Sequence, residues 1–81
     1  MSPRIRGIPG PYQFYFVSFD CTEPPHIHVD RERRSVKFWL EPVEICRNRG
    51  FSSRELGKIR TLVLEHHQLL IEAWDEHCNP K

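Results

Sequence analysis

The chain has 81 residues, of which 38% are hydrophobic and 28% are charged, and its formal net charge is +1. This length predicts a single small domain over residues 1–81, near the size at which one hydrophobic core is only just sufficient. No apolar run approaches the roughly 20 residues that a membrane-spanning helix needs, and the charged N-terminus lacks the apolar stretch of a secretory signal. We therefore expect a cytoplasmic protein that does not engage membranes.

The charges are unevenly distributed along the chain. Residues 1–60 contain eleven Lys or Arg and seven Asp or Glu, whereas residues 61–81 contain one and four. This asymmetry predicts a surface on which positive and negative charges are separated, but it is too mild to imply nucleic-acid binding by itself. The cysteines Cys21, Cys46 and Cys78 are widely spaced and form no Cys-x-x-Cys pair, so we expect free thiols and neither a disulfide framework nor a zinc ribbon.

Three strands are predicted in the first half of the chain, after at most a short leading strand at Ile5 and Arg6. Residues 13–19 are rich in aromatic and β-branched side chains. Residues 26–30 follow two prolines that restrict the backbone to extended conformations. Residues 35–40 alternate between apolar and polar side chains, and the charged residues 30–34 between these two strands predict a hairpin tip.

The second half of the chain is predicted to be helical. Residues 43–48 are interpreted as a helical turn, and Ser52 with Glu55 matches a capping box that starts a helix. Apolar residues then recur at helical spacing over residues 53–77, a length of roughly 37 Å at 1.5 Å per residue. Such a helix either bends near His66 and His67 or projects onto another chain. The expected fold class is α+β, with a small antiparallel β-meander of about three strands followed by a long amphipathic C-terminal helix that is continuous, bent or split.

Several short segments, taken together and in this order, resemble the family known as domain of unknown function 4160 (DUF4160). They are residues 24–29 (PPHIHV), 37–43 (KFWLEPV), 48–52 (NRGFS), 55–56 (EL) and 73–74 (AW). The resemblance implies a small bacterial protein, often encoded beside another short protein, an arrangement typical of toxin–antitoxin pairs. The chain departs from the family pattern at Glu76, His77 and Cys78, where an aromatic-rich ending is common.

The strand over residues 26–30 carries the first candidate site. Alternation places Ile27 and Val29 on one face, and His26, His28 and Asp30 on the other. Two imidazoles and a carboxylate on one face suit a divalent metal, so these three are candidate metal ligands. The alternative is structural: the histidines hydrogen-bond to nearby backbone or to Glu23.

Two further hypotheses involve phosphate chemistry. His26 and His28 are candidate catalytic residues for acid–base chemistry, with Arg33, Lys37 or Arg49 holding a phosphate as in a metal-free ribonuclease. Separately, four basic residues and an exposed Trp39 form a candidate nucleic-acid or anion site, and the alternative that we favour is a solvated hairpin tip. These four residues are Arg31, Arg33, Arg34 and Lys37.

The helical region carries more apolar surface than a small sheet can cover. Leu62, Leu69 and Trp74 are the candidate partner interface, and Leu64 and Ile71 widen it. We therefore expect a homo-oligomer, such as a dimer, or a small protein partner. The favoured function is a protein–protein interaction module, as in one half of a toxin–antitoxin-like pair, and the alternative is a small ribonuclease or metal-binding hydrolase that uses His26 and His28.

Overall fold

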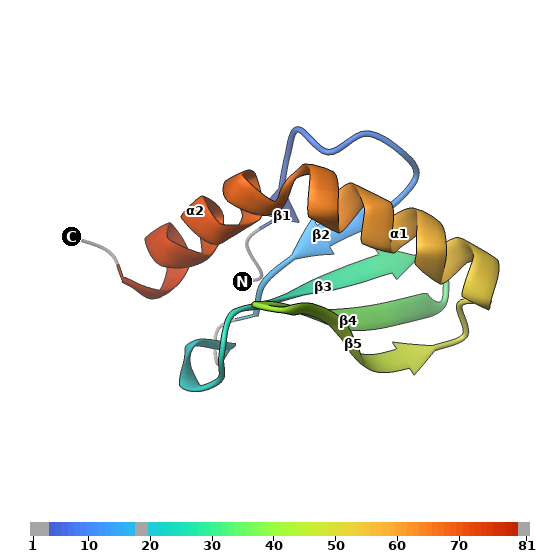
Figure 1. Ribbon diagram of the computed structural model, residues 1–81, viewed down its shortest axis with the longest axis horizontal. Coiled ribbons are helices and arrows are strands. Elements are labelled where there is room, and N and C mark those ends of the chain that lie inside the picture. Colours follow the sequence, from blue (N-terminus) through green and yellow to red (C-terminus); the bar gives the residue numbers. More distant parts are fainter. Residues whose placement is uncertain (1–3, 18–19, 80–81) are drawn as a thin grey trace.

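The structure, a computed structural model, describes residues 4–17 and 20–79. Within these residues a five-stranded antiparallel sheet in the order β1-β2-β3-β4-β5 is followed by two α-helices, which lie along one face of the sheet (Figure 1). The strands are β1 (Arg4–Ile5), β2 (Gln13–Tyr15), β3 (His26–Arg31), β4 (Arg34–Leu40) and β5 (Val43–Arg49). A 3₁₀ turn, η1 (Asp20–Thr22), precedes β3, and the helices are α1 (Ser53–Glu65) and α2 (His67–Cys78).

The α+β class is confirmed, but the expectation of about three strands and one long helix is wrong. Residues 43–48, interpreted from the sequence as a helical turn, belong to strand β5. This segment pairs with β4, with Val43 opposite Leu40 and Glu44 opposite Trp39. A register shift between Lys37 and Phe38 interrupts the pairing. Because a bulge of this kind breaks the regular two-residue alternation, the strand pattern of this segment is hard to recognise in the sequence.

The helical region is divided at His66, one of the two histidines near which a bend was one of the expected alternatives. His66 has backbone angles of φ −111° and ψ 22°, outside the helical range. Its backbone N–H and its Nδ1 both donate to the Leu62 carbonyl, at 3.0 and 2.9 Å. The His67 Nε2 donates to the Leu40 carbonyl at 2.6 Å, which attaches the start of α2 to the end of β4.

The core lies between the sheet and the two helices. Its sheet side is formed by alternate strand residues, and its helical side by residues three or four apart, as each periodicity requires. The buried apolar residues are Phe14, Phe16, Ile27, Val29, Val36, Phe38, Leu40, Phe51, Ile59, Val63, Leu70 and Trp74. The predicted cap is present as well, since the Ser52 hydroxyl accepts from the Glu55 backbone N–H at 3.2 Å.

The expectation of three free thiols is wrong for two of them. Cys21 in η1 and Cys78 at the end of α2 form a disulfide across 57 residues of sequence, with their Cα atoms 5.4 Å apart. Cys46 is free and exposed. The pairing was missed because folding, and not spacing in the sequence, brings the 3₁₀ turn against the last helix.

Neither helix in the described part of the chain combines the length and the apolar character that crossing a bilayer requires.

Candidate functional site

A row of polar side chains crosses the face of the sheet that the helices leave open. Tyr15 on β2 lies opposite His28 on β3, His28 lies opposite Lys37 on β4, and Lys37 lies opposite Arg47 on β5. Ile27 and Val29, the neighbours of His28, point the other way and are buried under the helices. Strand alternation therefore assembles these four side chains, which are far apart in the sequence, into one row.

The open face is hollowed beside this row. A cavity of about 320 Å³ spans β2 to β5 and is lined by Tyr15, Glu23, His28, Ser35, Val36, Lys37, Cys46, Arg47 and Arg49. Ser35 and Arg49 belong to the next row of the sheet, where they are paired with each other. Their position gives the cavity a second layer of polar groups.

Hydrogen bonds and ring contacts hold the β2 and β3 side of the cavity. The Tyr15 ring stacks on the His28 ring, with centroids 5.3 Å apart and planes at 20°. The Tyr15 hydroxyl donates to Asp30 Oδ1 at 3.0 Å. Asp30 thus orients Tyr15, and the two stacked rings form an aromatic wall.

The remaining lining residues make the cavity cationic. The Lys37 ammonium donates to the Glu23 carboxylate and lies 4.9 Å from the centroid of the Trp39 ring. Arg47 and Arg49 are exposed, and neither forms an ion pair with any residue in the described part of the chain. Three cations therefore face one carboxylate, an imbalance that favours an anionic ligand.

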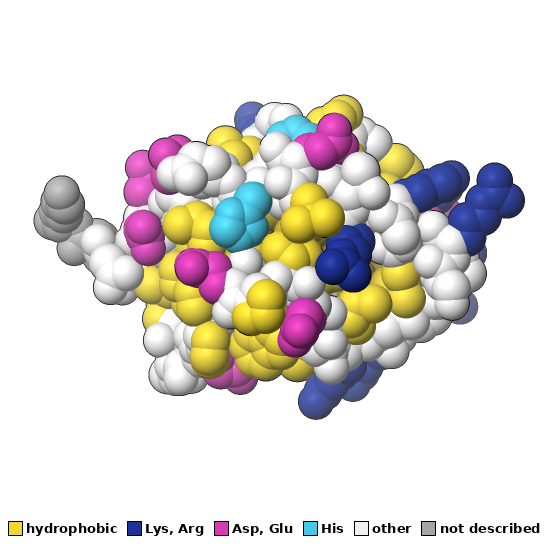
Figure 2. Space-filling model, viewed as in Figure 1, with side chains coloured by type: hydrophobic (Ala, Val, Ile, Leu, Met, Phe, Trp, Pro, Cys, Tyr) yellow, Lys and Arg dark blue, Asp and Glu magenta, His cyan; other side chains and the backbone are white. Residues whose placement is uncertain are grey.

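Charge is also segregated over the visible surface. Figure 2 shows Lys and Arg gathered at the end where α1 begins and below β5, whereas Asp and Glu lie mostly toward α2. This distribution agrees with the sequence, in which residues 1–60 hold most of the basic residues.

His26 occupies a different environment from His28. It is fully buried, and its Nδ1 donates to the Pro24 carbonyl at 2.8 Å. Its ring packs against Trp39 and Trp74, with centroids 5.7 and 5.1 Å away. This arrangement matches the structural alternative from the sequence, because a ring enclosed between two tryptophans cannot exchange protons with a substrate.

The three predicted metal ligands are not gathered around one point. The rings of His26 and His28 are perpendicular, with centroids 5.1 Å apart, and the Asp30 carboxylate accepts from Tyr15. Among the His, Cys, Asp and Glu side chains of residues 4–17 and 20–79, only one group of three has donor atoms that all lie within 4.8 Å of one another. It consists of Cys21, His77 and Cys78. The metal set expected on β3 therefore has no support from this geometry.

The four predicted basic residues are also divided. Arg31 donates to the Glu55 carboxylate at 2.8 Å, and Arg34 lies 3.5 Å from its second oxygen. Arg33 is exposed at the hairpin tip, and only Lys37 lies on the open face. The structure thus uses Arg31 and Arg34 to join the β3–β4 hairpin to α1.

Glu55 is the centre of that junction, because its carboxylate also accepts from the Tyr12 hydroxyl at 3.1 Å. Burial by itself would raise the pKa of Glu55, but the hydrogen bonds from Arg31 and Tyr12 outweigh it and hold the pKa below its usual value. In a full capping box the Glu55 carboxylate would also accept from the Ser52 backbone N–H, but here it accepts from Arg31 and Tyr12 instead.

The residues predicted to form a partner interface do not lie together on the surface. Trp74 is 5% exposed and packs edge to face on Phe16, so it belongs to the core. Leu62 is half-buried, whereas Leu64 and Leu69 are 52% and 39% exposed. Of the three residues predicted for the interface, only Leu69 is exposed.

Tyr15 and Arg47 are site residues that reasoning from the sequence missed. Strand alternation over residues 13–15 puts Tyr15 on the face opposite Phe14. Arg47 does not follow from alternation, because unbroken alternation would put it on the side of Val43 and Ile45. Only the register shift opposite Lys37 and Phe38 brings it to the open face. Neither a curated protein nor a solved structure matches the chain. The model of one family does match, over residues 12–75, a span that includes the whole open-face row from Tyr15 to Arg47. That family is described as a domain of unknown function, DUF4160, and the chain belongs to it, as its short motifs indicated.

Proposed function

We propose that this protein binds single-stranded nucleic acid through the phosphates, on the open face of its sheet. The observation that carries the proposal is the row of Tyr15, His28, Lys37 and Arg47 on four adjacent strands. It combines cations with aromatic rings, which is the combination that proteins use to hold single strands.

The cations supply the phosphate contacts. The Arg47 and Arg49 guanidinium groups offer planar pairs of N–H donors that match phosphate oxygens, and Lys37 adds a point charge between β3 and β5. Glu23 at the border of the cavity limits the positive potential. We therefore expect moderate affinity, since a net charge of +1 adds little long-range attraction.

Salt dependence gives a quantitative test of this binding mode. If Lys37, Arg47 and Arg49 each neutralise one phosphate, the logarithm of the binding constant falls against the logarithm of salt with a slope of about −2. Removal of one arginine reduces that slope by about 0.7 and weakens binding to all sequences alike.

The experiment is fluorescence anisotropy with labelled single-stranded RNA and DNA oligonucleotides at several salt concentrations. We expect the Arg47→Ala, Arg49→Ala double variant to bind about tenfold more weakly or worse. Arg60→Ala is the matched control, because Arg60 is exposed on α1, on the far side of the sheet. Equal binding by the double variant and the wild type, or binding that is insensitive to salt, would refute the proposal.

A ribonuclease activity is the second candidate, and the position of His28 favours it. His28 lines the cavity directly beside Lys37, so its imidazole can exchange a proton with a bound phosphodiester while Lys37 stabilises the added negative charge. With His26 buried, such a site relies on one histidine. RNA cleavage that disappears in His28→Asn but persists in the His66→Asn control would support it, and cleavage unchanged in His28→Asn would exclude it.

The protein-partner role has less structural support. It rests on the exposed leucines Leu64 and Leu69, whereas Trp74, the aromatic anchor that such an interface favours, is buried in the core. Sedimentation of the protein at micromolar concentration tests this role. A stable monomer that binds oligonucleotides would favour the open face as the working surface.

A further inference from the structure

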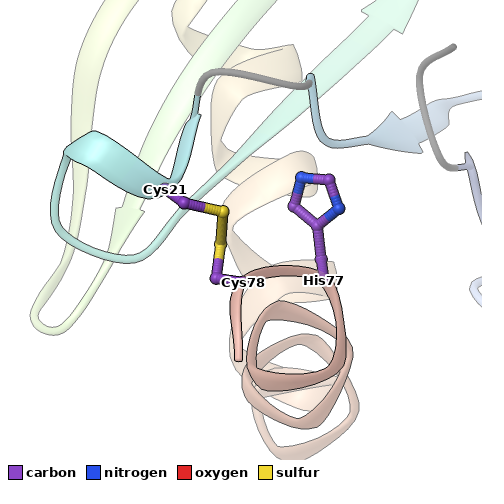
Figure 3. A group of neighbouring side chains, drawn as sticks. All are labelled: Cys21, His77 and Cys78. Atoms are coloured by element: carbon purple, nitrogen blue, oxygen red, sulfur yellow. A yellow bond between two sulfur atoms is a disulfide. The ribbon is translucent and has the colours of Figure 1, made fainter. Parts of the chain in front are cut away.

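Cys21, His77 and Cys78 form a cluster at the end of the molecule remote from the β3–β4 hairpin tip. Figure 3 shows the disulfide between the 3₁₀ turn and the last turn of α2, with the His77 imidazole beside it. The two sulfur atoms and one His77 nitrogen all lie within 4.8 Å of one another. These are the donor types that zinc prefers in proteins.

We propose that reduction of this disulfide converts the cluster into a Zn²⁺ site, with the thiolates of Cys21 and Cys78 and the imidazole of His77 as ligands. At Zn–S and Zn–N distances of roughly 2.3 and 2.1 Å, the donor atoms of a tetrahedral site stand roughly 3.7 Å apart. The three donors already lie within 4.8 Å, so side-chain adjustment is sufficient. The fourth position of the tetrahedron is left to water.

The chemistry balances with a phosphine as the reductant. The phosphine attacks one sulfur and displaces the other as a thiolate. Water then hydrolyses the phosphorus–sulfur bond, which releases the second cysteine, supplies one proton to each sulfur and leaves the phosphine oxide. Zn²⁺ displaces one proton from each thiol, so binding releases two protons and depends on pH. In the oxidised protein the same sulfur atoms are bonded to each other and cannot act as thiolate ligands.

The His77 ring is held in place by the core and not by the disulfide. It stacks on Phe16, with centroids 5.3 Å apart and planes at 17°, and its Nε2 donates to the Val17 carbonyl at 3.1 Å. Zinc at Nδ1 would retain that carbonyl as a partner of the opposite nitrogen, an arrangement common around metal-bound histidines. Zinc at Nε2 would replace the hydrogen bond. In both cases Phe16 keeps the ring beside the two cysteines.

This site is separate from the cavity on the open face. The matched family region ends at residue 75, so His77 and Cys78 lie outside it. The third cysteine, Cys46, lines the open-face cavity on β5 and provides an internal control. In both redox states η1 stays attached to the end of α2, through the disulfide when oxidised and through the metal when reduced.

The test uses Co²⁺ as a spectroscopic substitute for Zn²⁺ on the full chain. After reduction with a phosphine, we expect a thiolate-to-Co²⁺ charge-transfer band at one equivalent, its loss on addition of Zn²⁺, and no band in the oxidised protein. Cys46→Ser should behave as the wild type. His77→Ala should bind the metal about tenfold more weakly or worse, and Cys78→Ser should lose the band.

Two results would overturn the proposal. One is a reduced wild-type protein that stays folded by circular dichroism but shows no charge-transfer band. The other is a band that persists in Cys78→Ser and disappears in Cys46→Ser, which would assign metal binding to the exposed thiol. The oxidised and reduced forms of the same chain can be compared directly, so the test does not depend on any variant folding.

Discussion

The two faces of the sheet differ in what covers them, although alternate residues of the same strands build both. On β4, Val36, Phe38 and Leu40 point toward the helices and are at most 3% exposed. Their neighbours Ser35 and Lys37 point to the open face and line its cavity. The helix-covered face therefore determines stability, and the open face is available for binding.

His26 is an exception to this difference between a buried face and an open face. Its position on β3 assigns it to the open side together with His28, yet it is fully buried because Trp39 and Trp74 enclose its ring. Strand alternation determines the side of the sheet on which a residue lies. Exposure depends on what packs over that side, and here α2 reaches past the end of the strands (Figure 1).

The largest expected effect is on stability, and it should appear at only one of two adjacent residues that lie on opposite faces of the sheet. Phe38→Ala should lower the free energy of unfolding by about 3 to 5 kcal/mol, because it leaves a cavity at a fully buried position. Lys37→Ala should lower it by less than about 1 kcal/mol, since it removes an ion pair with the half-exposed Glu23 and a contact with the Trp39 ring and leaves no cavity in the core. Urea denaturation measures both values. Similar losses for the two variants would contradict the division of the sheet into a stabilising face and a binding face.

A charge reversal on the open face should affect binding and leave stability alone. Arg47→Glu should weaken oligonucleotide binding about tenfold or more, because it replaces a phosphate contact with repulsion. The unfolding midpoint should stay close to that of the wild type, since Arg47 is exposed. Arg60→Glu on α1 changes the net charge equally and is the control, so a similar loss of binding there would point to a general charge effect.

A smaller loss of stability is expected at the start of α1, the helix that covers one face of the sheet. Ser52→Ala removes the side chain that caps the helix and should cost about 1 kcal/mol of stability. Ser53→Ala, at the first residue of the helix, should be nearly neutral because no capping bond is lost. Thermal or urea unfolding distinguishes the two variants. A larger loss of stability for Ser53→Ala than for Ser52→Ala would mean that Ser52 is not the residue that caps the helix.

The smallest expected effect concerns pH and the junction at Glu55. The pKa of Glu55 in the folded protein is below the ordinary value of 4.5, so its contribution to stability is present above pH 4.5 and is lost as the pH falls through the folded pKa. Glu55→Gln should flatten the acid side of the curve of stability against pH. Glu44→Gln, an exposed carboxylate on β5, is the control. An unchanged acid limb in Glu55→Gln would mean that the contacts with Arg31 and Tyr12 do not stabilise the carboxylate.

Much of the fold could be predicted from local patterns. The alternation of Ile27 and Val29 with His28, the hairpin tip between β3 and β4, and the Ser52 cap all depend on residues close together in the chain. Strand β5 was missed because its regular alternation is disrupted where it pairs with Lys37 and Phe38. The site was predicted only in part, since Arg47 became visible as a site residue once β5 was placed beside β4.

By itself, the sequence determined the α+β class, the membership of DUF4160 and the division of β3 and β4 into an apolar and a polar side, because these depend on periodicity and on short motifs. Only the tertiary structure decided that His26 is buried while His28 lines a cavity, that Arg31 and Arg34 bind Glu55, and that Cys21 meets Cys78. The physical reason is that these outcomes depend on contacts between segments distant in the chain. Such contacts form only when the helices cover one face of the sheet and leave the other open.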